Sequence, residues 1–204
     1  HQRALNAWDN GYFKKQILEV PEALHKDEGV REETTKEILS QLKPAFKPDG
    51  VITAGNSSQI SDGAAALLLV SEDILNKFNL EPIAKIKSMA VVGTDPVLML
   101  SGPIPATRKA LDRAKLKPED INLAEINEAF SSVVGAWRKE FPEINYENVN
   151  ANGGSIAIGH PLGATGARLM TNLIHEMKRN KLKYGLQAIC EGGGTANATI
   201  VELV

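Results

Sequence analysis

The sequence contains one cysteine, Cys190, so it cannot form an internal disulfide, and this is typical of a reducing compartment. No apolar run approaches the roughly 20 residues of a membrane-spanning helix, and no signal-peptide pattern appears at the start. The formal net charge of -2 provides no basic surface for nucleic acid. We therefore expect a cytoplasmic protein that binds neither nucleic acid nor a membrane.

The sequence also lacks an initiator methionine, and residues 1–8 resemble the middle of a helix because no N-cap precedes them. We therefore expect the chain to be part of a longer protein, as a fragment or a cleavage product. The apolar fraction of 43% and the charged fraction of 24% are ordinary for globular proteins, so we expect a packed core. A chain of 204 residues is long enough for one or two domains.

Apolar periodicity predicts strands that alternate with helices, which indicates an α/β fold with helices on the faces of a sheet. The apolar run at residues 64–70 is compatible with a strand or a helix, and its bounding Gly63 and Ser71 favour a short strand covered on both faces. The predicted strands are residues 51–54, 64–70, 83–92, 121–126, 186–190 and 196–203. The predicted helices are residues 1–13, 31–42, 71–78, 105–116, 128–141 and 164–178.

Residues 152–168 hold five glycines around His160, which suggests tight turns or a close approach of the backbone to a ligand. His160 precedes Pro161 and a predicted helix, whose N-terminus would stabilise negative charge. The segment is not a phosphate-binding Walker loop, since no Gly-Lys-Ser/Thr follows, and it lacks the strand context of a dinucleotide site. His160 is thus either an ordinary loop histidine or a functional one, and its position favours function.

Two further residues have both a structural and a chemical interpretation. Cys190, which precedes three glycines, is either a buried structural cysteine or an acid/base group, because a free thiol has a pKa of about 8.5. Asn127 is either the N-cap of the helix after it or an amide that holds a water molecule or a carbonyl oxygen. The residues alone leave both questions open.

Five stretches, in order and at family-like spacing, resemble signatures of the thiolase family. They are Gly-Asn-Ser-Ser at 55–58 with Asp-Gly-Ala-Ala at 62–65, Ser-Gly-Pro-Ile-Pro-Ala at 101–106, Asn-Glu-Ala-Phe at 127–130, the glycine-rich segment at 153–168, and Cys-Glu-Gly-Gly-Gly at 190–194. The resemblance spans most of the chain. It implies a layered α/β fold with a mixed sheet and helices on both faces.

The resemblance also implies catalytic roles. Cys190 matches the cysteine that removes the α-proton of the second acyl-CoA in condensation, or reprotonates the enolate in thiolysis. His160 matches the histidine that activates the nucleophilic cysteine. Together with a water molecule held by Asn127, His160 resembles the oxyanion hole for the thioester enolate. The backbone N–H of Gly192 matches a donor of a second oxyanion hole.

The resemblance further implies a site for coenzyme A, which is a substrate or product, with no cofactor and no metal. Ser58 and Ala54 resemble contacts to the pantetheine arm, and Arg31 resembles a residue near the nucleotide end. Ala129 and Phe130 resemble residues that line the acyl pocket.

Thiolases form their acyl-enzyme on another cysteine, in the N-terminal half of the family fold, which this sequence does not contain. We therefore expect a C-terminal half, inactive alone, with the N-terminal half and a second copy as partners in a homodimer or homotetramer. Residues 1–60 would be part of the loop domain, residues 61–80 a strand and helix of the N-terminal domain, and residues 81–204 the C-terminal domain. The run at 64–70 would then lack its neighbours in the sheet.

The resemblance thus predicts an acyl-CoA acyltransferase of fatty acid metabolism, which makes or cleaves 3-ketoacyl-CoA by Claisen condensation or thiolysis. The main alternative is a non-catalytic thiolase-like subunit that binds acyl-CoA. A further alternative is a reaction on a single cysteine, with Cys190 as the nucleophile beside His160.

Overall fold

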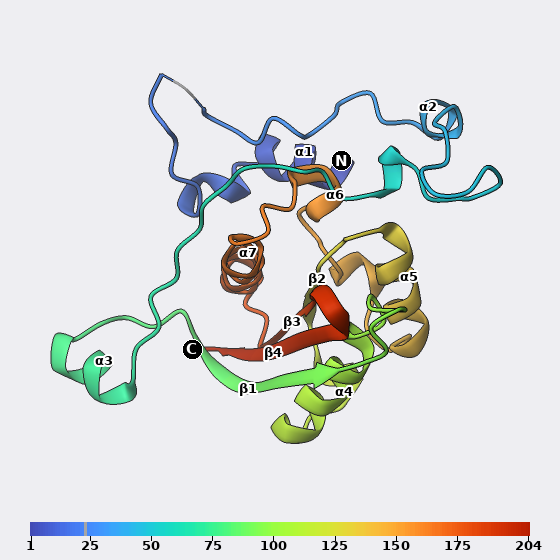
Figure 1. The fold of residues 1–204 in the computed structure, drawn as a ribbon. Coiled ribbons are helices and arrows are strands. Elements are labelled where there is room, and N and C mark those ends of the chain that lie inside the picture. The colour runs from blue at the N-terminus through green and yellow to red at the C-terminus, as the bar shows by residue number, and fades with distance from the viewer. Residues whose placement is uncertain (23) are drawn as a thin grey trace.

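A four-stranded mixed sheet forms the centre of the computed structural model, which describes residues 1–22 and 24–204. The strand order is β1-β4-β3-β2 (Figure 1). β4 (Thr195–Leu203) runs antiparallel to both β1 (Ala84–Gly93) and β3 (Tyr184–Cys190), whereas β2 (Leu123–Ile126) is parallel to β3. The predicted mixed α/β fold is confirmed, and β2 and β3 end at the same edge of the sheet.

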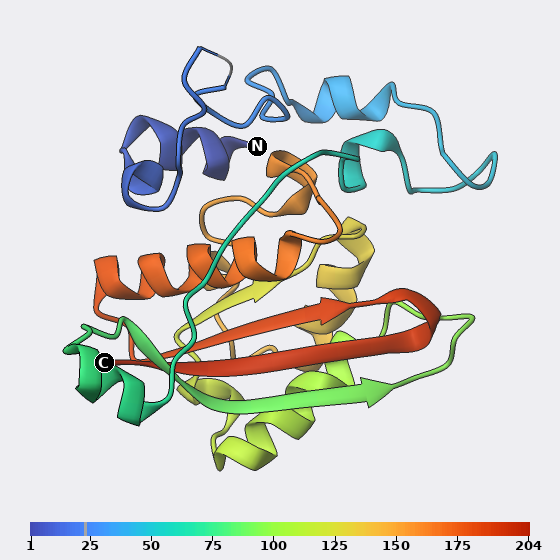
Figure 2. The same cartoon turned by 60° about the vertical axis from the view of Figure 1, so that its left-hand side comes forward.

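Helices cover both faces of the sheet (Figure 2). α7 (Thr165–Asn180) packs on one face, and α4 (Pro103–Ala114) and α5 (Ser131–Glu140) pack on the other. The side chains of β3 alternate between them, as expected for a strand buried on both faces. Leu186 and Ala188 enter the core under α4 and α5.

Gly185, the residue before Leu186, faces α7, where a Cβ atom would collide with the sulfur of Met177 and with Leu173. The absence of a side chain at this position therefore lets the apolar face of α7 approach β3 closely. Both α7 side chains are fully buried and lie one turn apart, as the predicted periodicity of this helix requires.

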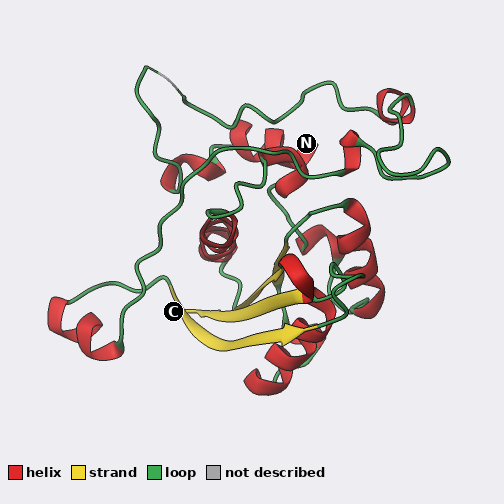
Figure 3. Cartoon of the chain, viewed as in Figure 1, coloured by secondary structure: helices red, strands yellow, loops and turns green. Residues whose placement is uncertain are grey.

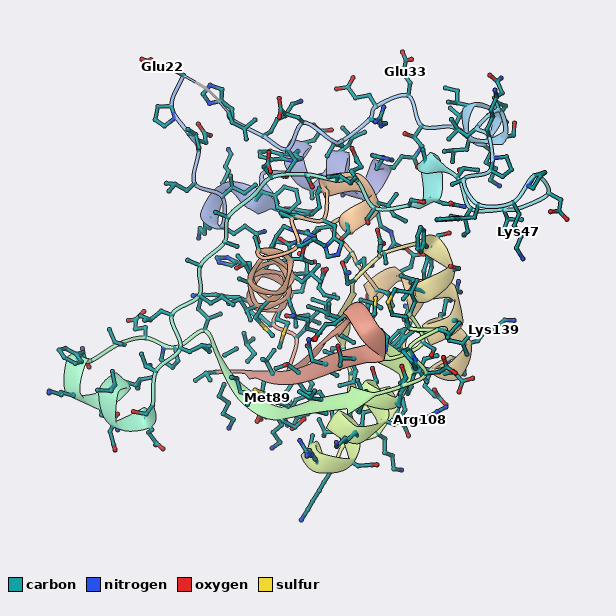
Figure 4. All side chains as sticks on the ribbon, viewed as in Figure 1. Glu22, Glu33, Lys47, Met89, Arg108 and Lys139 are labelled. Atoms are coloured by element: carbon teal, nitrogen blue, oxygen red, sulfur yellow. The ribbon has the colours of Figure 1, made fainter. Side chains whose placement is uncertain are left out.

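Residues 1–22 and 24–63 form a layer above α7 that consists mainly of loops (Figure 3). It holds α1 (Gln2–Asp9) and α2 (Lys36–Ser40), and the side chains of Glu33 and Lys47 point away from the rest of the molecule (Figure 4). The short helix α6 (Ser155–Ile158) lies directly beneath this layer (Figure 1). Short 3-10 helices occur at Tyr12–Lys15, Ala54–Asn56, Pro118–Asp120, Tyr146–Asn148 and Gly192–Gly194.

Two predictions in the upper layer differ from the structure. The helix predicted at residues 31–42 is only α2, because Thr35 caps its N-terminus by accepting a hydrogen bond from Ile38 N at 3.3 Å. The strand predicted at 51–54 is absent from the described chain. Thr53 forms only an isolated bridge with Pro44, and its N–H donates to Asn56 Oδ1 at 2.8 Å, which turns the chain.

The strand predicted at residues 64–70 is also wrong. This segment pairs with no strand among the residues that the structure describes, and Leu68 and Leu69 are 81% and 72% exposed. Apolar side chains alone do not make a strand when no neighbour provides backbone hydrogen bonds. The helix that follows, α3 (Glu72–Phe78), is confirmed, and the hydroxyl of Ser71 accepts from Ile74 N at 3.4 Å.

The predicted boundaries of the other elements differ by a few residues, and one difference bears on function. The helix predicted to begin at residue 128 begins at Ser131, and its N-cap is Phe130. The interpretation of Asn127 as an N-cap is therefore wrong. The helix α6, which the sequence did not predict, arises inside the glycine-rich segment. None of the helices in the described residues has the length and apolar character needed to cross a membrane.

Candidate active site

A cavity of about 530 Å³ lies at the edge of the sheet where the parallel strands β2 and β3 both end. Residues that directly follow or end these strands are therefore placed together. Apolar side chains from the loop before α4 and from β3 form part of the wall, including Met99, Leu100 and Ile189. Six of the nine residues predicted for the site line this cavity: Asn127, Ala129, Phe130, His160, Cys190 and Gly192.

Asn127 follows β2 and is fully buried. Its backbone N–H donates to Ala188 O at 3.0 Å, which extends the pairing with β3 by one residue. Its side-chain Oδ1 accepts from Ser155 Oγ at 2.7 Å, and its Nδ2 lies 3.4 Å from His160 Nε2. The side chain thus presents its amide group to the histidine and the cavity.

His160 is held by its backbone in a tight loop. Its N–H contacts both Gln59 O, at 3.0 Å, and Ser61 Oγ, at 2.9 Å. The preceding Gly159 has a φ of 87°, and a Cβ atom there would collide with Ser61 Oγ. Glycine is therefore the residue that this approach requires, and the loop places the imidazole at the cavity wall.

The hydrogen bonds of Thr165 determine the tautomer of His160. Thr165 Oγ1 donates its only hydrogen to Pro161 O at 2.8 Å, so it must accept from His160 Nδ1 at 2.6 Å. Nδ1 therefore carries the proton, and Nε2 keeps its lone pair. Burial, followed by the positive charge of Arg168, lowers the pKa of His160 below its usual 6.5, so the imidazole is a neutral base at pH 7.

Cys190 ends β3 and is a free thiol with 7% of its surface exposed. Burial, the largest cause, raises its pKa, and the charge of Glu191 acts in the same direction. The thiol therefore carries its proton at neutral pH. This state suits a proton donor and opposes the interpretation of Cys190 as a nucleophile, since the thiolate is the attacking form.

Gly192 begins the 3-10 helix Gly192–Gly194, which borders the cavity. A Cβ atom at Gly192 would meet nothing within 4 Å, so this part of the backbone faces open space. Thr94 N donates to Gly194 O at 2.7 Å and fixes the glycine turn against the loop before α4.

A group of buried and half-buried titratable side chains lies behind the histidine, around Arg168 of α7. Arg168 Nη2 donates to Ser155 Oγ at 3.0 Å and to Gly159 O at 3.1 Å. Glu125 of β2 is 1% exposed, and its burial raises its pKa to about 8 against the opposing charge of Arg168. Burial likewise raises the pKa of Asp27. A protonated Glu125 leaves the charge of Arg168 free to act on His160.

The sequence interpretation missed Ser155, Thr165 and Arg168. One signal was available, because Thr165 and Arg168 are three residues apart and so share a face of the predicted helix directly after His160. The contact of Ser155 with Asn127 joins residues 28 positions apart and has no such signal.

The three remaining predicted residues lie elsewhere. Ser58 N donates to Ala129 O at 3.1 Å, so its segment runs beside the cavity. Ala54 and Arg31 are exposed in the upper layer. None of the three is among the described residues that line the cavity, and their contacts with coenzyme A stay predictions. Within residues 1–22 and 24–204, no three His, Cys, Asp or Glu side chains are grouped as metal ligands.

Comparison with known proteins gives consistent similarities over the whole chain. The family model for "Thiolase, C-terminal domain" matches residues 80–203, and that for "Thiolase, N-terminal domain" matches residues 1–73. A steroid 3-ketoacyl-CoA thiolase of Mycobacterium tuberculosis is 49% identical, over 99% of this chain and 50% of the relative. The 3-ketoacyl-CoA thiolase of Bacillus subtilis is 45% identical, over 100% of this chain and 56% of the relative.

Two solved structures have the same fold. The acetyl-CoA acetyltransferase of Bacillus anthracis superposes with a TM-score of 0.93 at 43% identity, over 100% of this chain and 53% of that structure. The human mitochondrial 3-ketoacyl-CoA thiolase in complex with CoA gives a TM-score of 0.91 at 37% identity, over 100% of this chain and 52% of that structure. The chain spans about half the length of the curated relatives it matches. The predicted division at residues 60 and 80 into parts of three domains stays a prediction.

Proposed function

This chain belongs to the thiolase family, and on that premise we propose that the whole protein is an acyl-CoA acyltransferase that makes 3-ketoacyl-CoA by Claisen condensation or cleaves it by thiolysis. The observation that carries the proposal is the convergence of three groups on one cavity. They are a histidine with an unprotonated Nε2, a protonated thiol and a buried amide, from His160, Cys190 and Asn127.

In the first half-reaction, His160 Nε2 takes the proton of the nucleophilic cysteine. We place that cysteine in a part of the protein outside these 204 residues, because Cys190 is the only cysteine here. The resulting thiolate attacks the thioester carbonyl, and the bond to the coenzyme A sulfur breaks. The departing sulfur takes the proton of Cys190, which leaves Cys190 as a thiolate.

In the second half-reaction, the Cys190 thiolate removes the α-proton of a second acyl-CoA. The enolate oxygen accepts hydrogen bonds from His160 Nε2–H and from a water molecule on Asn127. The carbanion attacks the acyl-enzyme, whose developing oxyanion faces the backbone N–H of Gly192. Expulsion of the enzyme thiolate, which recovers its proton from His160, completes the cycle, and thiolysis is the reverse.

Charge stabilisation carries most of the barrier reduction in this scheme. Donors fixed before the reaction need no reorganisation, and loss of one such donor typically costs about 10²- to 10³-fold in kcat. The apolar side chains of Ala129, Phe130 and Leu100 in the cavity wall strengthen these interactions because they lower the local dielectric.

The proposal extends to the substrates, the cellular location and the oligomeric state of the protein. Its substrates are thioesters of coenzyme A, with Ser58, Ala54 and Arg31 on the side of the coenzyme, and its role is in fatty acid metabolism. Support comes from the names of its relatives and from a neighbouring structure that holds CoA. We place the protein in the cytoplasm because the free thiol of Cys190 suits a reducing compartment. We assign it a homodimer or homotetramer by analogy with the family.

The test measures thiolysis of acetoacetyl-CoA by the full-length protein and three variants, Cys190→Ala, His160→Ala and Asn127→Ala. Each variant should retain its fold and lose about 10²-fold or more in kcat, since each removes one group of the cycle. Ser88→Ala is the control, because Ser88 is also buried and hydrogen-bonded, to Ala110 O at 2.8 Å, and is absent from the cavity wall. Its kcat should equal that of the wild type.

The alternatives predict different results. Binding of coenzyme A without turnover would support the non-catalytic subunit. An acyl-CoA alkylating analogue that labels Cys190 would support the single-cysteine reaction, whereas label on another cysteine of the full-length protein supports the proposal. Full activity of Cys190→Ala would refute the role given to this thiol.

A further inference from the structure

We propose that Ser155 is a positioning residue that fixes the orientation of the Asn127 amide, so that Nδ2 and not Oδ1 faces His160 and the cavity. The inference deepens the proposed function and rests on it for its kinetic consequences. It starts from an uninterrupted series of hydrogen bonds. Arg168 Nη2 donates to Ser155 Oγ at 3.0 Å, Ser155 Oγ contacts Asn127 Oδ1 at 2.7 Å, and Asn127 Nδ2 lies 3.4 Å from His160 Nε2.

The direction of this series follows first from Arg168. A guanidinium group has donors and no acceptor, so the hydroxyl of Ser155 accepts from it and cannot donate to it. The hydroxyl hydrogen is therefore free to point to Asn127, and the atom that receives it must be an acceptor. This requirement places Oδ1 toward Ser155 and Nδ2 on the opposite side of the amide.

The direction follows independently from the other end. Thr165 holds the proton of His160 on Nδ1, so Nε2 is an acceptor and needs a donor from Asn127. Both ends of the series thus select the same orientation of one amide. A reversed amide would place two acceptors against each other at His160 and two donors against each other at Ser155.

The hydroxyl of Ser155 has no structural task that competes with this one. Although Ser155 begins α6, the N-cap is Gly154 and no side chain caps the helix. Other contacts hold α6 in place, since Ile156 N donates to Glu128 Oε2 at 3.0 Å and Gly159 O accepts from Arg168. Removal of the hydroxyl should therefore leave α6 in position. It should release the amide of Asn127 and leave Arg168 Nη2 with Gly159 O as its acceptor.

The kinetic experiment is a double-mutant cycle in the full-length protein, with Ser155→Ala, Asn127→Ala and the double variant. Thiolysis of acetoacetyl-CoA by Ser155→Ala should have kcat lowered about tenfold and KM within about twofold of the wild type, because Ser155 is not among the cavity-lining residues. In the Asn127→Ala background the same change should have no further effect. The matched control is again Ser88→Ala, which loses a buried hydrogen bond outside the site.

The second experiment does not depend on turnover. In protein labelled with ¹⁵N-histidine, the His160 signals should show protonated Nδ1 and unprotonated Nε2. In Ser155→Ala a reversed amide would place Oδ1 against Nε2 and favour the imidazolium, so the titration midpoint should move upward. Arg168, whose charge opposes protonation of the ring, keeps that charge and its hydrogen bond to Gly159 O in this variant.

The results of the two experiments distinguish failure of the proposed function from failure of the inference about Ser155. If the wild type has no thiolase activity, the proposed function fails, and the histidine titration alone decides the role of Ser155. If the wild type is active, an equal loss from Ser155→Ala with and without Asn127 would overturn the inference. Wild-type kcat in Ser155→Ala, or an unchanged titration midpoint, would overturn it as well.

Discussion

Replacement of Glu125 by glutamine tests the electrostatics on which the histidine depends. Glu125 lies on β2 behind the cavity, and its pKa of about 8 means that the folded protein holds it neutral at pH 7. Glutamine has nearly the same shape and stays neutral at every pH. The change therefore removes the titration of this carboxyl group and keeps its packing.

The sign and size of the effect follow from linkage. In the unfolded chain the carboxyl group ionises near 4.5, whereas the folded protein keeps its proton up to about 8. Between these values the folded state binds one more proton, so wild-type stability falls by about 1.4 kcal/mol per pH unit. The stabilising contribution of the protonated Glu125 carboxyl group is fully present below pH 4.5 and is lost above pH 8. This interval of 3.5 pH units sets an upper limit of roughly 5 kcal/mol on the change in the free energy of unfolding.

The assay is urea unfolding of both proteins at several pH values between about 5 and 8. The difference in unfolding free energy between the two proteins cancels the effect of the other titrating groups. The free energy of unfolding of Glu125→Gln should increase relative to that of the wild type as the pH rises. A constant difference would refute a raised pKa. A variant less stable by about 3–5 kcal/mol at pH 7 would show instead that Glu125 is ionised and paired with Arg168.

Three more predictions concern single properties of the site and the core. The lowered pKa of His160 places the acidic limb of the kcat/KM profile of the full-length protein below pH 6.5, and a limb above 6.5 would contradict the neutral imidazole. Thr165→Val removes the acceptor of His160 Nδ1–H, so kcat should fall about tenfold with little change in KM, as measured by steady-state thiolysis. Leu173→Ala should lower the urea-unfolding free energy by about 3–5 kcal/mol, whereas Val97→Ala, at a side chain 90% exposed, should stay within about 0.5 kcal/mol.

The sequence located the four strands of the sheet because each carries its own local pattern of apolar residues. The strand predicted at 83–92 is β1, and that at 196–203 is β4, each within one residue at either end. The run at 64–70 has an equally apolar pattern and forms no strand. An apolar pattern indicates that the side chains of a segment favour burial, but it does not indicate whether a neighbouring element is present to bury them.

For the candidate site too, local sequence predicts which residues take part but not how contacts between distant segments orient them. Motifs identified Cys190, His160 and Asn127, because strand ends and glycine turns are visible in local sequence. The orientation of these groups depends on side-chain contacts between distant segments, such as Ser155 with Asn127. The carboxyl group of Glu125 was a second missed signal, since a charged residue inside an apolar strand requires a change of protonation or a partner.

One physical cause gives the cavity both of its acid/base groups. Burial disfavours the charged form of any titrating side chain, so it lowers the pKa of His160 and raises that of Cys190. The same environment thus holds a base with its lone pair free and an acid with its proton in place at neutral pH. Arg168 separates the two pKa values further, because its positive charge acts against the imidazolium. Two groups with opposed proton states in one cavity are the starting condition that acyl transfer between thiols requires, and burial is the largest cause of both states.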